Sequence, residues 1–185
     1  MKTILPFDEL NAFKIRLPGH FANGRIKSTD DVEDIIDEML DLYLLAMANG
    51  IRSVNEQFGT NIQLNSLEIE QIIYKKIDGA TWEDRIRTWY EVGGTEADIE
   101  RIAETEAHRD GNAAAYETAI KAGATQKTWE CMMLPTSRDT HVYLNGTTVG
   151  INDEFYTFMG NHAMYPGQFG VAEEDVNCLC QISFK

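Results

Sequence analysis

The spacing of apolar residues predicts one long helix in the first third of the chain, from about residue 29 to 59. Apolar side chains recur there at three- and four-residue intervals, which is the period of one helix face. Thr29 or Asp30 can cap the start of this helix, and Glu33 follows Asp30 at the spacing of a capping box. The helix is expected to end near Gly59. The pattern is carried by Val32, Ile35, Ile36, Met39, Tyr43, Met47, Ile51, Val54 and Phe58.

Three further helices are predicted before residue 125. They span about 65–79, 81–93 and 95–123, and each begins with a residue that favours the N-cap and ends at a glycine. The capping residues are Asn65, Thr81 and Thr95, and the stops are Asp78-Gly79, Gly93-Gly94 and Gly123.

The two ends of the chain show different patterns. Residues 1–28 contain prolines and glycines and no sustained period, so they are predicted to form an irregular N-terminal arm. In residues 126–185, short apolar runs alternate with turn residues, which indicates short strands. The runs are 129–134, 147–151, 155–158 and 176–184, and residues 141–144 fit either a helical turn or a short strand.

These elements predict an α+β protein in three parts. An irregular arm (1–28) is followed by a helical domain (29–125) and by a small, mostly antiparallel sheet domain (126–185) that packs on the last long helix.

Length and composition indicate a globular protein without disulfides. A chain of 185 residues is long enough to bury a core without disulfide support, and its three cysteines, an odd number, argue against a disulfide framework. With 43% hydrophobic and 25% charged residues it has the composition of a soluble globular protein. No apolar run has the roughly 18 residues of a membrane span, and the start of the chain lacks a signal-peptide pattern, so neither secretion nor a membrane location is expected.

The charge balance bears on the kind of partner. Sixteen Lys and Arg residues stand against 30 Asp and Glu residues, which gives a formal charge of -14. Such a field repels phosphate backbones and attracts basic surfaces. Direct binding to duplex DNA is therefore disfavoured, and a basic protein partner is expected.

The polar motifs gather in the second half of the chain, and their order resembles the C-terminal domain of the phage Mu F-like minor head proteins. The resemblance covers about residues 80–185 and rests on six short pieces, each weak alone and specific only in this order. The pieces are Ile102-Ala103-Glu104-Thr105-Glu106-Ala107-His108-Arg109, Trp129, Arg138-Asp139-Thr140-His141, Leu144-Asn145-Gly146, Tyr165-Pro166-Gly167 and Asn177-Cys178-Leu179-Cys180. The resemblance implies a minor head protein of a tailed phage or prophage, present in the virion and in the host cytoplasm during assembly. It further implies contacts with portal and capsid proteins in head assembly, DNA packaging or ejection, and no enzymatic activity.

Some members of the resembling family carry cysteines at the positions of Arg138 and His141 and a histidine at that of Asp175, which together suit structural zinc. Here Arg138 replaces the first of these cysteines, and arginine cannot ligate a cation. The metal-free interpretation is therefore favoured and no cofactor is expected. If zinc is bound, the fallback ligands are His141, Asp175, Cys178 and Cys180. Cys131 is assigned to the core.

In the metal-free interpretation, a structural polar cluster replaces the zinc. The predicted members are Glu106, Arg138, Asp139 and His141, because polar side chains between an apolar strand and a tight turn need partners if they are buried. Thr105, Glu106 and Arg109 share one helix face and are expected to border the small sheet.

Two other function classes stay open. The first is a zinc-dependent hydrolase or nuclease that uses His141, Cys178 and Cys180, with Glu106 or Asp139 as the base. Its weakness is the lack of a basic substrate groove. The second is a phage-borne toxin, since Mu F-like segments also occur fused to toxin domains, although no such domain is expected after Lys185.

Overall fold

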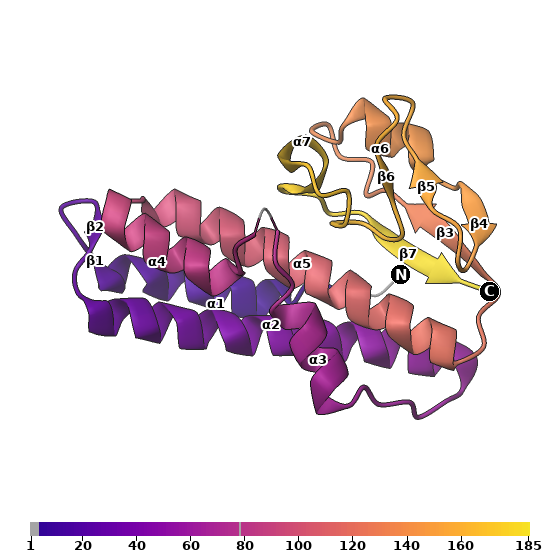
Figure 1. Cartoon of the computed structure of the whole chain (residues 1–185), viewed down its shortest axis with the longest axis horizontal. Coiled ribbons are helices and arrows are strands. Elements are labelled where there is room, and N and C mark those ends of the chain that lie inside the picture. The colour runs from indigo at the N-terminus through magenta and orange to yellow at the C-terminus, as the bar shows by residue number, and fades with distance from the viewer. Residues whose placement is uncertain (1–3, 78) are drawn as a thin grey trace.

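In the computed structural model, helices make up most of the first two-thirds of the chain, and short strands with two short helices make up the rest (Figure 1). The structure describes residues 4–77 and 79–185. Its helices are α1 (Phe7–Arg16), a 3-10 turn (Leu17–His20), α2 (Thr29–Phe58), α3 (Ser66–Ile73), α4 (Trp82–Val92), α5 (Glu96–Lys121), α6 (Asp139–Leu144) and α7 (Ala172–Asp175). Its strands are β1 (Phe21–Ala22), β2 (Arg25–Ile26), β3 (Gln126–Glu130), β4 (Thr148–Gly150), β5 (Phe155–Tyr156), β6 (His162–Ala163) and β7 (Gln181–Phe184). The predicted α+β class is confirmed.

The N-terminal segment is more regular than predicted. The expected irregular arm, residues 1–28, contains α1, the 3-10 turn and the β1–β2 hairpin, while Met1–Thr3 lie outside the described residues. Leu10 and Phe13, three positions apart, are buried, and α1 contacts both α2 and α5. The helical spacing of Leu10, Phe13 and Leu17 covers only about two turns before Pro18, so the packing of α1 on the long helices decided its structure.

Helices α2 and α5 lie side by side and form the centre of the helical part (Figure 1). The N-cap of α2 is Ser28, whose side chain accepts a hydrogen bond from the Asp31 amide, and its C-cap is Gly59 at φ 65°. The predicted long helix is therefore confirmed, with its cap one residue earlier than expected. A side chain at Gly50 of α2 would overlap the Gly111 carbonyl of α5, so the two helices approach closely at this crossing.

The shorter helices follow their capping signals. Thr81 and Asp84 form a capping box at the start of α4, and Gly93 ends that helix in the left-handed region, as predicted. Helix α3 has the expected start at Asn65 but stops at Ile73, earlier than predicted. The chain there turns into an isolated bridge between Ile77 and Ala80, and Asp78 of the predicted stop lies outside the described residues. Among the described residues, no helix combines the length and the apolar character that a bilayer crossing requires.

The small sheet is antiparallel and lies against α5 through β7. Its strand order is β4-β3-β7, with Trp129 paired with Ile182 across the centre, and β5–β6 forms a separate hairpin. The predicted strands at 129–134 and 176–184 are both shifted: β3 ends at Glu130 and β7 begins only at Gln181. The residues 131–137 leave the sheet as a loop in which Met133 has φ 52°. Residues 141–144 adopt the helical alternative, as part of α6.

Candidate functional site

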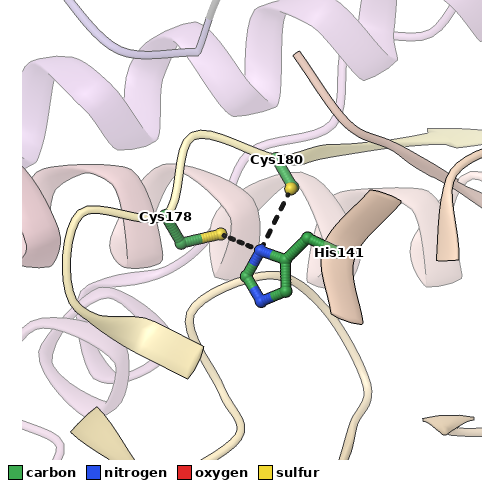
Figure 2. Close-up of side chains that lie close together, drawn as sticks. All are labelled: His141, Cys178 and Cys180. Atoms are coloured by element: carbon green, nitrogen blue, oxygen red, sulfur yellow. Dashed lines mark hydrogen bonds between the residues drawn. The ribbon is translucent and has the colours of Figure 1, made fainter. Parts of the chain in front are cut away.

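Residues 126–185, predicted to form the small sheet domain, contain a buried group of one histidine and two cysteines (Figure 2). His141 comes from α6, and Cys178 and Cys180 come from the loop that leads into β7. Figure 2 shows both sulfur atoms directed at the same ring nitrogen: His141 Nδ1 lies 3.6 Å from Cys178 Sγ and 3.4 Å from Cys180 Sγ. A cavity of about 50 Å³ borders this group.

The His141 ring contacts the carboxylate of Glu174, a residue that was not predicted from the sequence. Glu174 Oε2 lies 3.2 Å from His141 Nε2, without hydrogen-bond alignment, and accepts a 2.7 Å hydrogen bond from Thr140. Its Oε1 accepts a 3.0 Å bond from Asn161. Glu174 is only 3% exposed, so it ties α6 and the β5–β6 loop to α7 in a buried position. The four-residue helix that carries it is too short to show a period, and its acidic run gave no sequence signal for this role.

The predicted cluster members Arg138 and Asp139 lie at the start of α6. The Arg138 guanidinium donates a hydrogen bond to the Val176 carbonyl, which fixes the loop before the cysteines. Asp139 is exposed in the first turn of α6. No ion pair joins Arg138 to a carboxylate within the described part of the chain. Arg138 therefore supports the site through the backbone.

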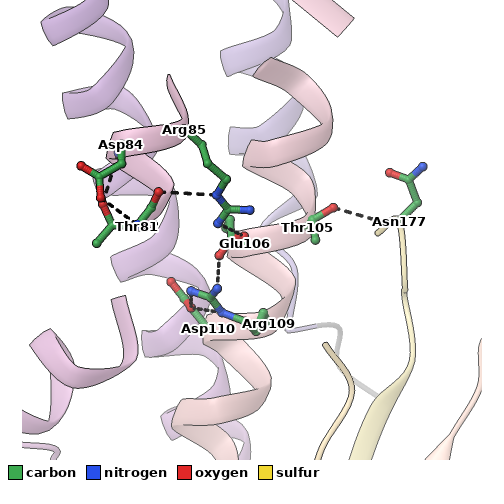
Figure 3. A network of polar contacts seen from close by, with 8 residues as sticks. All are labelled: Thr81, Asp84, Arg85, Thr105, Glu106, Arg109, Asp110 and Asn177. Carbon is green, nitrogen blue, oxygen red and sulfur yellow. Dashed lines mark hydrogen bonds and ion pairs between the residues drawn. The ribbon is translucent and has the colours of Figure 1, made fainter. Parts of the chain in front are cut away.

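Glu106 belongs to a different group of charges on α5 (Figure 3). It pairs with Arg85 of α4 at 2.6 Å and with Arg109 one turn further along α5. Arg109 also donates two hydrogen bonds, of 3.0 and 2.8 Å, to Asp110. Burial raises the pKa of Asp110 and Glu106 adds to this, while the Arg109 guanidinium opposes both. Glu106, Arg109 and Asp110 are at most 3% exposed and form a buried ion cluster in the helical part.

The border between α5 and the sheet domain includes two of the three expected residues. Thr105 accepts a 3.3 Å hydrogen bond from the Asn177 amide, as Figure 3 shows. The aliphatic stem of Arg109 packs against the Tyr165-Pro166-Gly167 turn. The contact is close: a Cβ added at Gly167 would lie 3.0 Å from Arg109 Cβ. Glu106, on the same helix, is turned toward α4 instead.

Asn112 and His108 are buried polar residues of α5 next to the loop that carries the cysteines. Asn112 Nδ2 donates to the Cys180 carbonyl at 3.2 Å, which anchors the Cys-x-Cys loop on α5. His108 is buried next to Asn112, and its pKa is lowered to about 4 by burial and by the nearby His141. A neutral His108 is therefore expected. Asn112 was not predicted from the sequence, and His108 appears there only as part of the motif from Ile102 to Arg109.

The histidine–cysteine group fits a metal only in part. His141, Cys178 and Cys180 have ligand atoms within 4.8 Å of one another and suit a soft ion such as zinc. The fourth fallback ligand, Asp175, accepts hydrogen bonds from the Phe169 and Gly170 amides at 2.9 and 2.7 Å, one on each oxygen. In this metal-free arrangement, the hydrogen bond to Cys178 and burial raise the pKa of Cys180, so its thiol is protonated. The donor set is thus one ligand short of a closed structural site.

Comparison with known proteins places this site in a family. Residues 59–183 match the family described as Phage Mu protein F like protein. The match begins before residue 80, where the predicted resemblance starts. The chain is 42% identical over 84 residues to the NAD(+)–arginine ADP-ribosyltransferase EFV of Enterococcus faecalis, which is 43% of this chain and 17% of that protein. It is 31% identical over 85 residues to the minor head protein GP7 of Bacillus phage SPP1, which is 44% of this chain and 28% of that protein.

The chain thus spans less than a third of the length of each of these relatives. No solved structure matches it. The family match covers well over half of the chain and includes α5, the sheet domain and the histidine–cysteine group. The chain belongs to the Phage Mu protein F like family.

Proposed function

We propose that this chain is a minor head protein of a tailed phage or prophage. In this role it contacts the portal and capsid proteins during head assembly, DNA packaging or ejection, first in the host cytoplasm and then in the virion. The observation that carries the proposal is the family match over residues 59–183 together with the similarity to the SPP1 minor head protein.

The geometry of the candidate site supports a structural role. His141, Glu174, Arg138 and Asn112 each contact a group of the same domain or of α5, so their polar atoms hold the domain together. The formal charge of -14 supports a basic protein partner over duplex DNA.

The enzymatic alternatives have weaker support. Glu106, one of the two candidate bases of a zinc hydrolase, is held by Arg85 and Arg109 in the buried ion cluster. Arginine-directed ADP-ribosylation is the activity named for the Enterococcus protein, and the shared 84 residues are 17% of that protein. We therefore propose that the chain acts without an enzymatic activity of its own.

The test is the location of the chain in phage particles. The chain is tagged in the phage or prophage that encodes it, and heads are purified on a density gradient and quantified by mass spectrometry. The chain is expected in the head fraction at a copy number far below that of the major capsid protein. A gene deletion serves as the control and is expected to reduce the yield of filled or infectious heads. Presence in the lysate together with absence from purified heads would contradict the proposal.

A further inference from the structure

We propose that an exposed aromatic patch on the small sheet domain is the surface that docks on the portal protein. The patch consists of Tyr143 from α6 and of Tyr156, Phe158 and Met159 from the β5–β6 hairpin, and is called the hairpin patch below. The inference rests on the proposed function and adds to it the docking surface and the chemistry of the partner.

The hairpin patch gathers large apolar side chains that the fold does not cover. Tyr143 is 60% exposed, Tyr156 59%, Phe158 55% and Met159 69%. The neighbouring Phe155 is fully buried against Trp129, so the alternation along β5 fixes Tyr156 on the outer face. Figure 1 shows α6 and the hairpin next to each other at the end of the sheet domain away from the long helices. The segments that carry the patch therefore lie on the side of the domain away from α5.

The aromatic rings are held in place before any partner binds. Tyr143 and Phe158 meet edge to face with ring centroids 5.6 Å apart, although they come from segments 15 residues apart. Tyr156 lies 5.3 Å from the His162 ring, and its hydroxyl donates to Glu154 at 3.3 Å. Aromatic side chains that are already ordered lose little entropy on binding, which is why they dominate binding energy at interfaces.

The segment of the chain that carries the hairpin patch is acidic, which favours a basic partner. Between Asp139 and Phe184 the sequence contains no lysine and no arginine but six acidic residues. Of these, Asp139, Asp153 and Glu173 are exposed, and Glu154 is half-buried beside Tyr156. A second copy of the chain, a nucleic acid or an anionic bilayer would each bring like charge to this face. The matching surface is an apolar pocket ringed by Lys and Arg, and we assign it to the portal protein.

The experiment measures binding of the full chain to the purified, assembled portal protein encoded by the same phage genome. Tyr143→Ser and Phe158→Ser are each expected to weaken binding by about 30-fold or more, as interface aromatics do when truncated. Because both side chains are exposed, the unfolding midpoint and the far-UV circular dichroism should stay close to those of the wild type. The matched controls are Ile15→Ser and Val92→Ser, which truncate residues 80% and 64% exposed on the helical part and should change affinity less than about twofold. Raising the salt concentration should weaken binding of the wild-type chain.

The possible outcomes test the docking surface and the proposed function separately. Loss of portal binding in the patch variants, with the controls unaffected, supports the proposal. Wild-type affinity in the Tyr143→Ser, Phe158→Ser double variant would show that the hairpin patch is not the docking surface. An equal loss of affinity in the control variants would show the same. A chain that is present in purified heads but binds the major capsid protein in place of the portal overturns the choice of partner. Absence from purified heads is the separate result that removes the proposed function itself.

Discussion

The buried ion cluster on α5 should be sensitive to single substitutions. Arg109 holds the two buried carboxylates of Glu106 and Asp110, and all three side chains are at most 3% exposed. Replacing Arg109 by Met leaves two carboxylates close together without their main cation. The free energy of unfolding should fall by about 3 to 5 kcal/mol.

Chemical denaturation of the Arg109→Met variant checks this prediction. The matched control is Arg101→Met on the same helix, where the ion pair with Asp98 is largely exposed and should be worth under about 1 kcal/mol. Equal losses in the two variants would show that the buried cluster is no stronger than a surface pair.

Lys127 on β3 predicts a pH dependence of stability. Its side chain is fully buried, with Nζ 4.7 Å from the centre of the Tyr116 ring and 5.4 Å from that of Phe155, and burial lowers its pKa from 10.5 to about 8. Below pH 8 the amine is protonated in both states, so its destabilising effect is complete. Between pH 8 and 10.5 the unfolded chain binds more protons, so the stability contribution rises with pH.

The Lys127→Met variant isolates this contribution. At pH 7 it should be more stable than the wild type, by on the order of 1 to 2 kcal/mol. The difference should shrink as the pH rises from 8 toward 10, and the comparison of the two proteins removes the shared titration of other groups. A constant difference over that range would show that Lys127 does not titrate in the folded state as expected.

The histidine–cysteine group predicts weak metal binding. With three donors and no available fourth carboxylate, the purified full-length protein should carry well under one zinc ion per chain after dialysis. Elemental analysis measures this. Stoichiometric zinc that disappears in a Cys178→Ser variant would overturn the metal-free interpretation and would revive the hydrolase alternative.

At the scale of elements, the contact of the Tyr165-Pro166-Gly167 turn with α5 depends on Gly167. Gly167 has φ 86°, and an added Cβ would meet Arg109 Cβ at 3.0 Å and Arg109 Cα at 3.1 Å. Gly167→Ala should therefore combine left-handed strain with a clash against α5 and cost about 2 to 4 kcal/mol. Gly160→Ala is the matched control, because Gly160 has φ 89° and open space around it. The unfolding free energies of the two variants should differ, and equal values would mean that the turn can move away from α5 without cost.

At the scale of the whole molecule, α5 joins the helical part to the sheet domain. All residues from Glu106 to Tyr116 are buried, and Thr105 and Asn112 hold the cysteine loop by hydrogen bonds. The division of the chain at residues 125–126 stays a prediction, and a fragment of residues 126–185 tests it. That fragment should be unfolded, because about 60 residues bury a marginal core and this one also loses α5. A cooperative thermal transition in the fragment would show that the sheet domain folds alone.

Local interactions explain what the sequence determined. Asn65, Thr81 and Thr95 cap helices through contacts three residues along the chain, and Gly59 and Gly93 end helices through their own backbone freedom. For this reason the long helices, the class of the fold and the order of the motifs could be predicted. The boundaries of α3, β3 and β7 could not, because contacts between distant segments decided where pairing and packing stop.

Only the tertiary structure decided which polar groups meet. His141 could have faced any nearby carboxylate, and the fold supplied Glu174, 33 residues further along, while it turned Glu106 toward Arg85 and Arg109. Likewise, the amphipathic pattern of α1 was too short to predict a helix until α2 and α5 provided a surface for Leu10 and Phe13. The physical reason is the same in each case. The polar groups of a cap or turn form hydrogen bonds with residues a few positions away in the sequence, whereas a buried charge or a short apolar face needs partners that only the tertiary fold brings close.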